Sequence, residues 1–211
     1  MAALRETLDP TPESKALTVV GTLHDGSDTV VLLGPHEPEF WPRFTTSPEY
    51  RDGAPDPLDR WSKRIIQTLA TAWGGRAVFP SDGPPYPAFQ RWAQESGEAW
   101  QAPVGMLVHV HAGLMISFRG AVRFAGCHPL AKRPAENPCN SCTSQPCLTA
   151  CPVKALTASL PYDVAACQAH LATPQGQDCL EQGCRVRRAC PVSEGFGRLP
   201  EQSAFHMKAF L

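Results

Sequence analysis

The chain contains the segment Cys139-Asn-Ser-Cys142-Thr-Ser-Gln-Pro-Cys147-Leu-Thr-Ala-Cys151-Pro152, in which three closely spaced cysteines are followed by a fourth that directly precedes a proline. A second, looser series consists of Cys167 and the segment Cys179-Leu-Glu-Gln-Gly-Cys184-Arg-Val-Arg-Arg-Ala-Cys190-Pro191, which again closes on Cys-Pro. All but one of the 9 cysteines in the chain lie in these two series. The repeated Cys-Pro closure indicates one cysteine-rich module with two related halves.

The spacing of these cysteines is typical of iron–sulfur ligands. Thiolates two to four residues apart on a turn can bind one 4Fe-4S cluster, and in two-cluster ferredoxins the cysteine before the proline binds the other cluster. This pattern predicts two 4Fe-4S clusters whose ligands cross between the two series. We expect one cluster on Cys139, Cys142, Cys147 and Cys190, and the other on Cys151, Cys167, Cys179 and Cys184. Cys127 has no predicted role.

Zinc sites and disulfides are the two alternative uses of these cysteines. Structural zinc sites usually pair their ligands as Cys-x2-4-Cys, and only Cys139 with Cys142, and Cys179 with Cys184, approach that pattern. Disulfides require an oxidising compartment, and the N-terminal residues include no apolar signal segment that would export the chain. The sequence therefore favours iron–sulfur clusters in a reducing, cytoplasmic location.

Composition limits the partners of the protein. A length of 211 residues suits one full domain and a small module. The net charge of -1 and the pI of about 6.6 provide no basic surface for a nucleic acid. No apolar run approaches the ~20 residues that span a bilayer. We therefore expect neither a nucleic acid nor a membrane as partner, but a redox donor protein or a small reductant.

The N-terminal part, expected as a domain of residues 1–126, has the pattern of an α+β fold. Leu17 to Leu23 and Thr29 to Leu33 are β-branched runs on either side of a turn, which predicts a hairpin. Pro57 to Trp73 is the clearest helix, with Asp56 as N-cap and Gly74 as the C-terminal stop. Further elements are expected as a strand at 76–79 and a helix at 88–100, with Trp41 and Phe44 in the core.

A second hairpin is expected between Met106–His111 and Leu114–Arg119, since both runs alternate in polarity. His109 and His111 share one face of its first strand, where they could bind a metal. No third ligand is in view, so solvent-facing or hydrogen-bonded histidines are the preferred interpretation.

The C-terminal part, residues 127–211, is expected as the cluster-binding domain, preceded by a linker at 126–138. Val164 to Leu171 is predicted to be a helix that carries Cys167. Arg185, Arg187 and Arg188 lie between two cysteine ligands, where they either offset the negative charge of a cluster or are solvated. Residues 203–211 are predicted to form a helix that docks back onto the first domain.

The cysteine pattern resembles the two-cluster module of the epoxyqueuosine reductases and the corrinoid reductive dehalogenases. The matching pieces are Cys139-Asn-Ser-Cys142, Ala150-Cys151-Pro152-Val-Lys-Ala155-Leu156, Cys167 and Cys190-Pro191. The spacings from Cys142 to Cys147, from Cys179 to Cys184 and from Cys184 to Cys190 are longer than in those families. The chain also ends about where the tRNA-binding extension of longer epoxyqueuosine reductases would begin, and no twin-arginine signal precedes it. A stand-alone tRNA reductase or a respiratory dehalogenase is therefore disfavoured.

The first domain carries a second resemblance. The segment Gly105-Met-Leu-Val-His109-Val-His-Ala-Gly113-Leu-Met-Ile-Ser-Phe-Arg119-Gly120 is similar to a stretch of the cobalamin-processing protein MMACHC. Together the two resemblances imply a nitroreductase-related antiparallel sheet with flanking helices, followed by a bacterial-ferredoxin-like dicluster module. They also imply a corrinoid, or less readily a flavin, beside Phe118 and Arg119. We therefore expect a reductase that passes single electrons from two 4Fe-4S clusters to that cofactor; the alternative is a plain ferredoxin-type carrier.

Overall fold

The computed structural model describes residues 15–131, 135–159 and 161–211. It is of mixed α and β structure with antiparallel sheets, as expected, and its chain divides into two compact units. Unit 1 consists of Met1–Glu98 and Ser117–Ala135, and unit 2 of Ala99–Ile116 and Glu136–Leu211. This division differs from the predicted domains 1–126 and 127–211, because a segment from the middle of the chain belongs with the cysteines. The linker expected at 126–138 contains no helix or strand where it is described, and residues 132–134 lie outside the described residues.

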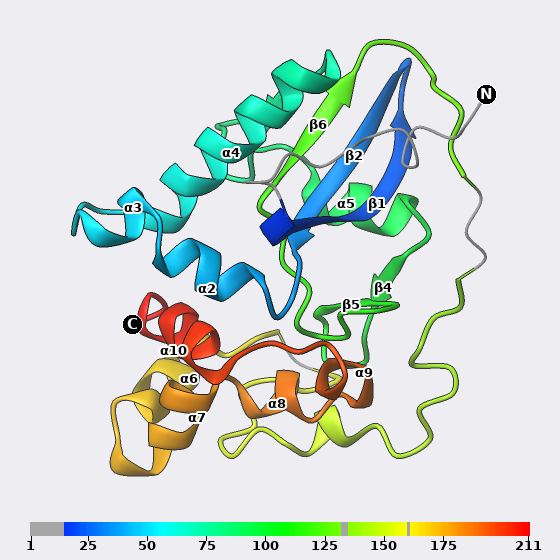
Figure 1. The fold of residues 1–211 in the computed structure, drawn as a ribbon. Helices are drawn as coiled ribbons and strands as arrows, with labels where there is room; N and C mark the ends of the chain where they lie inside the picture. The colour runs from blue at the N-terminus through cyan, green and yellow to red at the C-terminus, as the bar shows by residue number, and fades with distance from the viewer. Residues whose placement is uncertain (1–14, 132–134, 160) are drawn as a thin grey trace. The chain divides into compact units, whose positions relative to one another are not determined.

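Unit 1 is built on a four-stranded antiparallel sheet in the order β1-β2-β6-β3 (Figure 1). Its first two strands form the predicted hairpin, in which Asp25 pairs with Asp28 and leaves a two-residue turn between them. Gly26 in that turn has φ +64°, a value that glycine adopts at little cost. The strands are β1 (Leu17–Asp25), β2 (Asp28–Pro35), β3 (Arg76–Val78) and β6 (Gly120–Phe124).

Helix α4 (Pro57–Trp73) has the bounds that its sequence predicts. Gly74 ends it in the left-handed conformation, with φ +72°, and its N–H donates to the carbonyl groups of Ala70 and Thr71. Asp56 occupies the predicted N-cap position, and its carbonyl group accepts a hydrogen bond from the N–H of Arg60 at 3.0 Å. Asp56 precedes the helix with φ +52°, and its side chain makes no capping hydrogen bond, so Pro57 and the apolar face determine where the helix begins.

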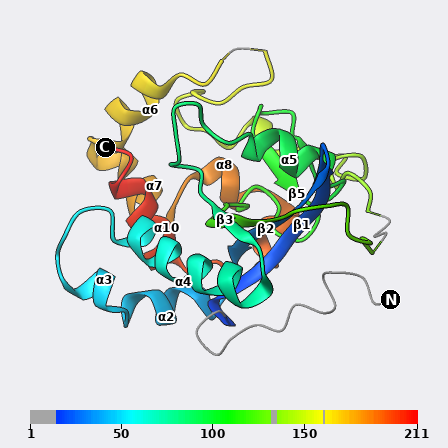
Figure 2. The same cartoon turned by 90° about the horizontal axis from the view of Figure 1, so that it is seen from above.

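The helices α4 and α5 (Phe89–Glu95) cover opposite faces of the sheet. A Cβ atom on Gly21 would lie 2.8 Å from Ser96 Oγ, just after α5, and one on Gly120 would lie 2.8 Å from Ile66 Cδ1 on α4. These two glycines pair with adjacent residues of β2, whose side chains point to opposite faces. Figure 2 shows the same arrangement, with α4 and α5 on either side of the strands.

Two short helices, α2 (Phe40–Thr45) and α3 (Pro48–Arg51), complete unit 1. Trp41 and Phe44 are buried, which confirms their prediction as core residues. Phe44 lies 5.2 Å from Tyr50 and 6.0 Å from Trp61, ring centroid to centroid, with the rings edge to face. This aromatic group attaches α2 and α3 to the first turns of α4.

The structure corrects the second hairpin. The predicted helix at 88–100 ends at Glu95, because Gly97 adopts φ +72°, and Ala99–Gln101 forms strand β4. This strand, rather than 114–119, is the partner of β5 (Leu107–His109). Residues 110–119 contain no strand, and only a single bridge joins His109 to Gly113.

Unit 2 combines the β4–β5 hairpin with short helices. Helix α6 (Val164–Leu171) has its predicted bounds, and the Asp163 side chain accepts a hydrogen bond from the N–H of Ala166 at its first turn. The others are the 3-10 helices η2 (Pro146–Leu148) and η3 (Pro174–Gly176) and the α-helices α7 (Gln177–Gln182), α8 (Arg185–Arg188), α9 (Pro191–Glu194) and α10 (Pro200–Lys208).

The C-terminal helix α10 packs against α7 within unit 2, and its docking onto the first domain stays a prediction. The two helices lie side by side in Figures 1 and 2. A Cβ atom on Gly183, at the end of α7, would lie 2.6 Å from Ser203 Cβ, and Gln202 is fully buried. The chain end therefore closes over the helix that carries Cys179.

Candidate metal centres

The structure brings Cys139, Cys142, Cys147 and Cys190 together, and we call this group the first site. Cys139 and Cys142 belong to one turn, in which the N–H of Cys142 donates to the carbonyl of Cys139 at 3.3 Å. Cys147 lies on η2, and Cys190 directly precedes α9. Asn137 stabilises this turn, because its side-chain oxygen accepts a hydrogen bond from the N–H of Cys139 at 3.0 Å.

Burial and mutual proximity set the electrostatics of the first site. Cys147 and Cys190 are buried, and both belong to the apolar core of unit 2 together with Val108 and Leu114. Burial raises the pKa of Cys139, and the neighbouring thiols of Cys147, Cys190 and Cys142 raise it further. Burial likewise raises the pKa of Cys147, where Cys190 and Cys142 act in the same direction. Four thiols this close repel one another as thiolates unless a cation binds them.

The second site consists of Cys151, Cys167, Cys179 and Cys184, which line one small cavity of about 20 Å³. They come from different elements: Cys167 from the middle of α6, Cys179 from α7, and Cys184 from the residue before α8. Burial raises the pKa of Cys167, as do Cys184 and Cys151. The order of ligands along the chain is thus crossed, since Cys190 joins the first site and Cys151 the second.

Hydrogen-bond donors surround the sulfur atoms of the second site. The N–H of Ala155 donates to Cys151 Sγ at 3.2 Å. The Tyr162 hydroxyl group is hydrogen-bonded to Cys167, and burial raises its pKa beyond the normal range. Burial also raises the pKa of Cys179. A hydrogen bond from the backbone N–H of Arg185 acts in the opposite direction and lowers that pKa. Donors aimed at sulfur stabilise a negative charge there, which is the environment of a metal-bound thiolate.

The loop after β5 is anchored on the cysteine region. Gly113 has φ +55°, and a Cβ atom there would lie 2.6 Å from the Ser193 N atom and 3.1 Å from Cys190 Sγ. The N–H of Leu114 donates to Ser193 Oγ at 2.9 Å, and Arg198 donates to the carbonyl of Met115 at 3.0 Å. Only a glycine permits this approach, so the hairpin positions the segment that carries Cys190.

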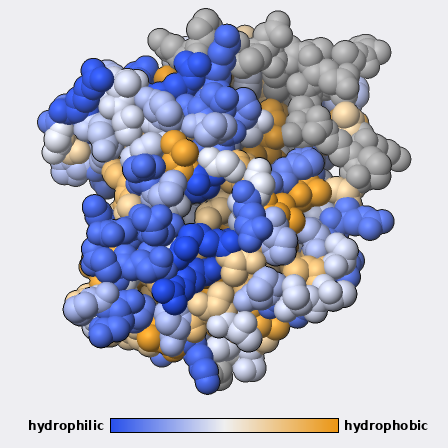
Figure 3. Space-filling view, turned by 60° about the horizontal axis from the view of Figure 1, so that its bottom comes forward, coloured by the Kyte–Doolittle hydropathy of each residue, from blue (hydrophilic) through white to orange (hydrophobic). Residues whose placement is uncertain are grey.

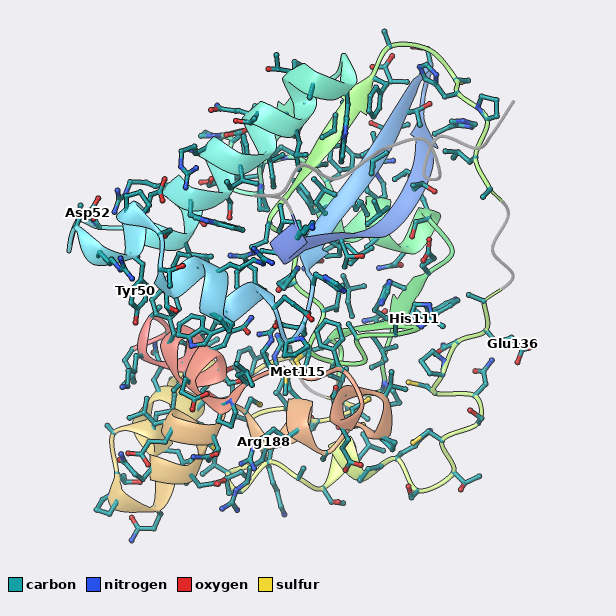
Figure 4. The ribbon with its side chains drawn as sticks, viewed as in Figure 1. Tyr50, Asp52, His111, Met115, Glu136 and Arg188 are labelled. Atoms are coloured by element: carbon teal, nitrogen blue, oxygen red, sulfur yellow. The ribbon has the colours of Figure 1, made fainter. Side chains whose placement is uncertain are left out.

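The three arginines between Cys184 and Cys190 have different surroundings. Arg185 and Arg188 bind the carboxylate of Asp178 at 2.6 and 2.5 Å, and Figure 4 labels Arg188. They hold the pKa of Asp178 below its usual range. Arg187 is half-buried instead and donates to the Leu114 carbonyl group, and burial lowers the pKa of its guanidinium group.

His109 is held by hydrogen bonds to its ring, in line with the preferred interpretation of this histidine pair. The Nδ1 atom of His109 accepts the N–H groups of His111 and Ala112, both at 3.2 Å, so it carries no proton and cannot also bind a metal. His109 is buried, whereas His111 is exposed (Figure 4). The hydrogen-bonded interpretation therefore holds for His109.

The predicted cofactor contacts Phe118 and Arg119 lie in unit 1. Both are half-buried. The Phe118 ring lies 5.9 Å from the ring of Phe89 on α5, and the N–H of Arg119 donates to the carbonyl of Leu33 at 2.8 Å. Cys127, also in unit 1, is exposed and lies beside the β1–β2 turn, with its sulfur 3.7 Å from the carbonyl oxygen of Ser27.

The two donor sets, with four thiols each, match the number of ligands of a 4Fe-4S cluster. Within the described part of the chain, no three His, Cys, Asp or Glu side chains converge closely enough to hold one metal ion. A tetrahedral zinc site needs four ligands within ~2.3 Å of the metal. A four-iron cube carries one thiolate at each iron corner, so its four sulfur ligands lie farther apart than those of a single zinc ion.

Sequence reasoning missed Tyr162, Ser193 and Gly113 as supporting residues. No sequence pattern indicates Tyr162, which lies in the loop before α6 and is hydrogen-bonded to Cys167. Gly113 follows His111-Ala112 at the end of a strand, where a glycine indicates a close backbone approach, and that signal was available.

None of the helices in residues 15–131, 135–159 and 161–211 has the length and apolar character needed to cross a membrane. On the face drawn in Figure 3, hydrophobic side chains are scattered among hydrophilic ones.

Comparisons with protein-family models, with curated proteins and with solved structures find no match for this chain. The resemblances therefore rest on the residues quoted for them, and the site on the geometry of its thiols.

Proposed function

We propose that this chain is an iron–sulfur reductase that passes single electrons through two 4Fe-4S clusters to a corrinoid bound by unit 1. The observation that carries the proposal is the grouping of eight cysteines into two sets of four, each drawn from both cysteine series. Such crossed sets are typical of two-cluster ferredoxins. A reducing compartment, which we propose to be the cytoplasm, would keep these thiols free of disulfides.

The residues of unit 2 would hold, orient and insulate the clusters. Bound clusters supply reversible one-electron storage, with potentials set by charge, hydrogen bonds to sulfur and solvent exposure. The Ala155 N–H and the Tyr162 hydroxyl would stabilise thiolate charge at the second site. At the first site, Val108 and Leu114 exclude water from Cys147 and Cys190.

The finer fold assignment is part of the same proposal. We regard unit 1, an antiparallel sheet with α4 and α5 on opposite faces, as a reduced nitroreductase-related domain. We regard unit 2 as a ferredoxin-like dicluster module enlarged by the β4–β5 hairpin. Arg119 and Phe118 are the proposed corrinoid contacts, with a flavin as the less favoured cofactor.

A plain ferredoxin-type carrier is the second candidate. The packing of the Phe118 ring against Phe89 favours it, because this contact gives the Phe118 side chain a structural role in unit 1. In that case unit 1 would serve as a docking scaffold for a redox partner and bind no cofactor of its own.

Anaerobic purification with iron and sulfide analysis tests the cluster proposal. We expect about eight iron and about eight sulfide per chain, four of each for every cluster. Zinc without sulfide would contradict the proposal.

Replacing single cysteines tests the assignment of ligands. Cys190→Ser should disturb the cluster held by Cys139, Cys142 and Cys147 and spare most of the other, as judged by EPR. The matched control is Cys127→Ser, which should keep all of the iron because Cys127 belongs to neither site. Loss of only the second cluster in Cys190→Ser would show that the sets are assigned wrongly.

Adding a corrinoid separates the reductase from the carrier. A ligand that binds only the folded protein raises its apparent stability, by about 2.7 kcal/mol at a hundredfold excess over Kd. We expect hydroxocobalamin to raise the melting temperature and to change its absorption spectrum on binding, and Arg119→Ala to weaken both effects. If neither cobalamin nor flavin has any effect, the carrier is the correct function.

A further inference from the structure

Helix α6 brings an imidazole ring to the second site in addition to the thiol of Cys167. His170 follows Cys167 by three residues on this helix, and residues three apart share one helix face. His170 lines the same cavity as the four cysteines of the second site. The ring is therefore a fifth polar group at a site whose four thiols already account for the proposed cluster ligands.

The Nε2 atom of His170 is buried and lacks a hydrogen bond. Among the described residues, no group is hydrogen-bonded to this atom. The residue as a whole is half-buried, so Nε2 belongs to the part of the side chain that is withdrawn from water. A buried ring nitrogen without a partner is costly and uncommon in folded proteins. The position therefore suits a partner that the cavity holds when the site is occupied.

The other residues around the cavity limit what that partner can be. Most of them are apolar, and the only further polar side chains in the lining belong to Tyr162 and Arg185. The hydroxyl group of Tyr162 is hydrogen-bonded to Cys167, and Arg185 binds the carboxylate of Asp178. The sulfur atoms of the site are therefore the groups left for His170 Nε2.

A cluster bound at the second site would offer hydrogen-bond acceptors only. Its thiolate and sulfide sulfur atoms carry negative charge and no hydrogen. A neutral imidazole has one N–H donor, which Nε2 can carry. We propose that His170 donates a hydrogen bond from Nε2 to a sulfur atom of the cluster at the second site, and thereby makes that cluster easier to reduce. This inference rests on the proposed function.

The expected effect on reduction follows from charge. A reduced cluster carries one more negative charge than an oxidised one, so a hydrogen bond to its sulfur favours the reduced form. A low-potential one-electron donor loses one electron and the cluster gains it. The proton stays on Nε2, and no bond to iron forms or breaks, because four cysteines already bind the four iron corners.

The test is an EPR-monitored redox titration of the cluster-loaded protein with sodium dithionite. His170→Leu removes the donor, and we expect it to lower the equilibrium constant for electron uptake at the second site by about tenfold, or ~59 mV for a one-electron couple. The potential of the first site should change much less. His170→Gln, whose amide group keeps an N–H donor, should restore much of the difference.

Gln168→Ala is the matched control. Gln168 lies on the same helix but not in the cavity lining, and its side chain donates to the carbonyl group of Phe210 at 2.8 Å. Its removal weakens the attachment of α6 without taking a donor from the second site, so both potentials should stay unchanged. A shift equal to that of His170→Leu would assign the effect to the position of α6 and overturn the inference.

Pulsed EPR of the reduced protein with isotopically labelled histidine provides a second measurement. A hydrogen bond from Nε2 should give a weak nitrogen coupling that His170→Leu abolishes. A strong coupling would identify His170 as an iron ligand in place of a cysteine, and the absence of any coupling would remove the contact; both results would overturn the inference.

The outcomes separate this inference from the proposed function. A wild-type protein without iron and sulfide would overturn both. Two intact clusters with unaltered potentials in His170→Leu would overturn the inference alone. If His170→Leu loses the second cluster while His170→Gln keeps it, the requirement for a donor is supported. Loss of the second cluster in both variants would give His170 a packing role and overturn the inference.

Discussion

Unit 1 contains a four-stranded sheet covered by the 17-residue helix α4, whereas the longest described helix of unit 2 is α10 with 9 residues. The core of unit 1 is made of aliphatic and aromatic side chains such as Val31, Leu33 and Phe44. In unit 2, two cysteines belong to the core itself and others pack against it. Apolar burial can therefore stabilise unit 1 by itself, whereas we expect the stability of unit 2 to depend on the clusters proposed for its cysteines.

Removal of iron should produce the largest difference between the two units. Under anaerobic chelation we expect backbone amides of α6 to α10 to lose at least ~100-fold in protection from hydrogen exchange, or about 2.7 kcal/mol. Amides of β1, β2 and β6 should change little, because their hydrogen bonds lie in a sheet that contains no cysteine. Hydrogen exchange measured by mass spectrometry gives both values, and equal loss in the two units would contradict the comparison.

A core substitution in unit 1 should have the opposite selectivity. Leu33→Ala removes a side chain that is 2% exposed, and its cavity should cost about 2–5 kcal/mol of unfolding free energy. The iron content should remain that of the wild type. Urea denaturation followed by tryptophan fluorescence, with iron analysis of the same sample, tests this; a matching loss of iron would mean that unit 2 folds only with unit 1.

Gly113→Ala should act on unit 2 alone. The new methyl group would approach Ser193 and Cys190, in a backbone conformation that costs about 1–2 kcal/mol for a residue with a Cβ atom. We expect the first cluster to be lost or labile and the second to persist in the EPR spectrum. The control is Gly105→Ala, which has φ +77° and open space around it, so it carries the backbone cost without the contact. Equal effects of the two variants would remove the role of the close approach.

The smallest effect concerns an ion pair of unit 1. Arg64 Nε donates to Glu49 Oε1 at 2.5 Å and holds the pKa of Glu49 below its usual range. A lowered carboxyl pKa contributes stability that is present above the unfolded pKa of about 4.3 and lost as the pH falls through the folded value. Because Arg64 is 43% exposed, Arg64→Met should cost less than ~1 kcal/mol at pH 7, and nothing at pH 2–3. Thermal unfolding across this pH range measures the difference; a cost that does not depend on pH would assign Arg64 a packing role.

Local patterns predicted the elements that depend on local chemistry. The bounds of α4 follow from a proline at the first position and a glycine at the end, and those of α6 from its apolar run. The hairpin at 17–35 follows from alternating β-branched residues around a glycine turn. The end of α5 was misjudged, although Gly97 carried the signal.

Pairing between distant segments was less accessible. Polarity alternates in 106–111 and in 114–119, which favours a hairpin between them, yet Ala99–Gln101 provides the backbone partner of β5. An alternating pattern shows which face of a strand is buried, but it does not identify the strand that pairs with it.

By itself, the sequence predicted that eight cysteines divide into two sets of four, because a proline after a cysteine redirects the chain toward the other set. Only the tertiary structure decided that Ala99–Ile116 joins those cysteines, that α10 packs on α7, and that Arg187 bonds to the Leu114 carbonyl group while Arg185 and Arg188 bind Asp178. Cysteine spacing is a local constraint that a short loop satisfies. Burial of a charge and the choice of a packing partner depend on the whole unit, so residues distant in sequence decide them.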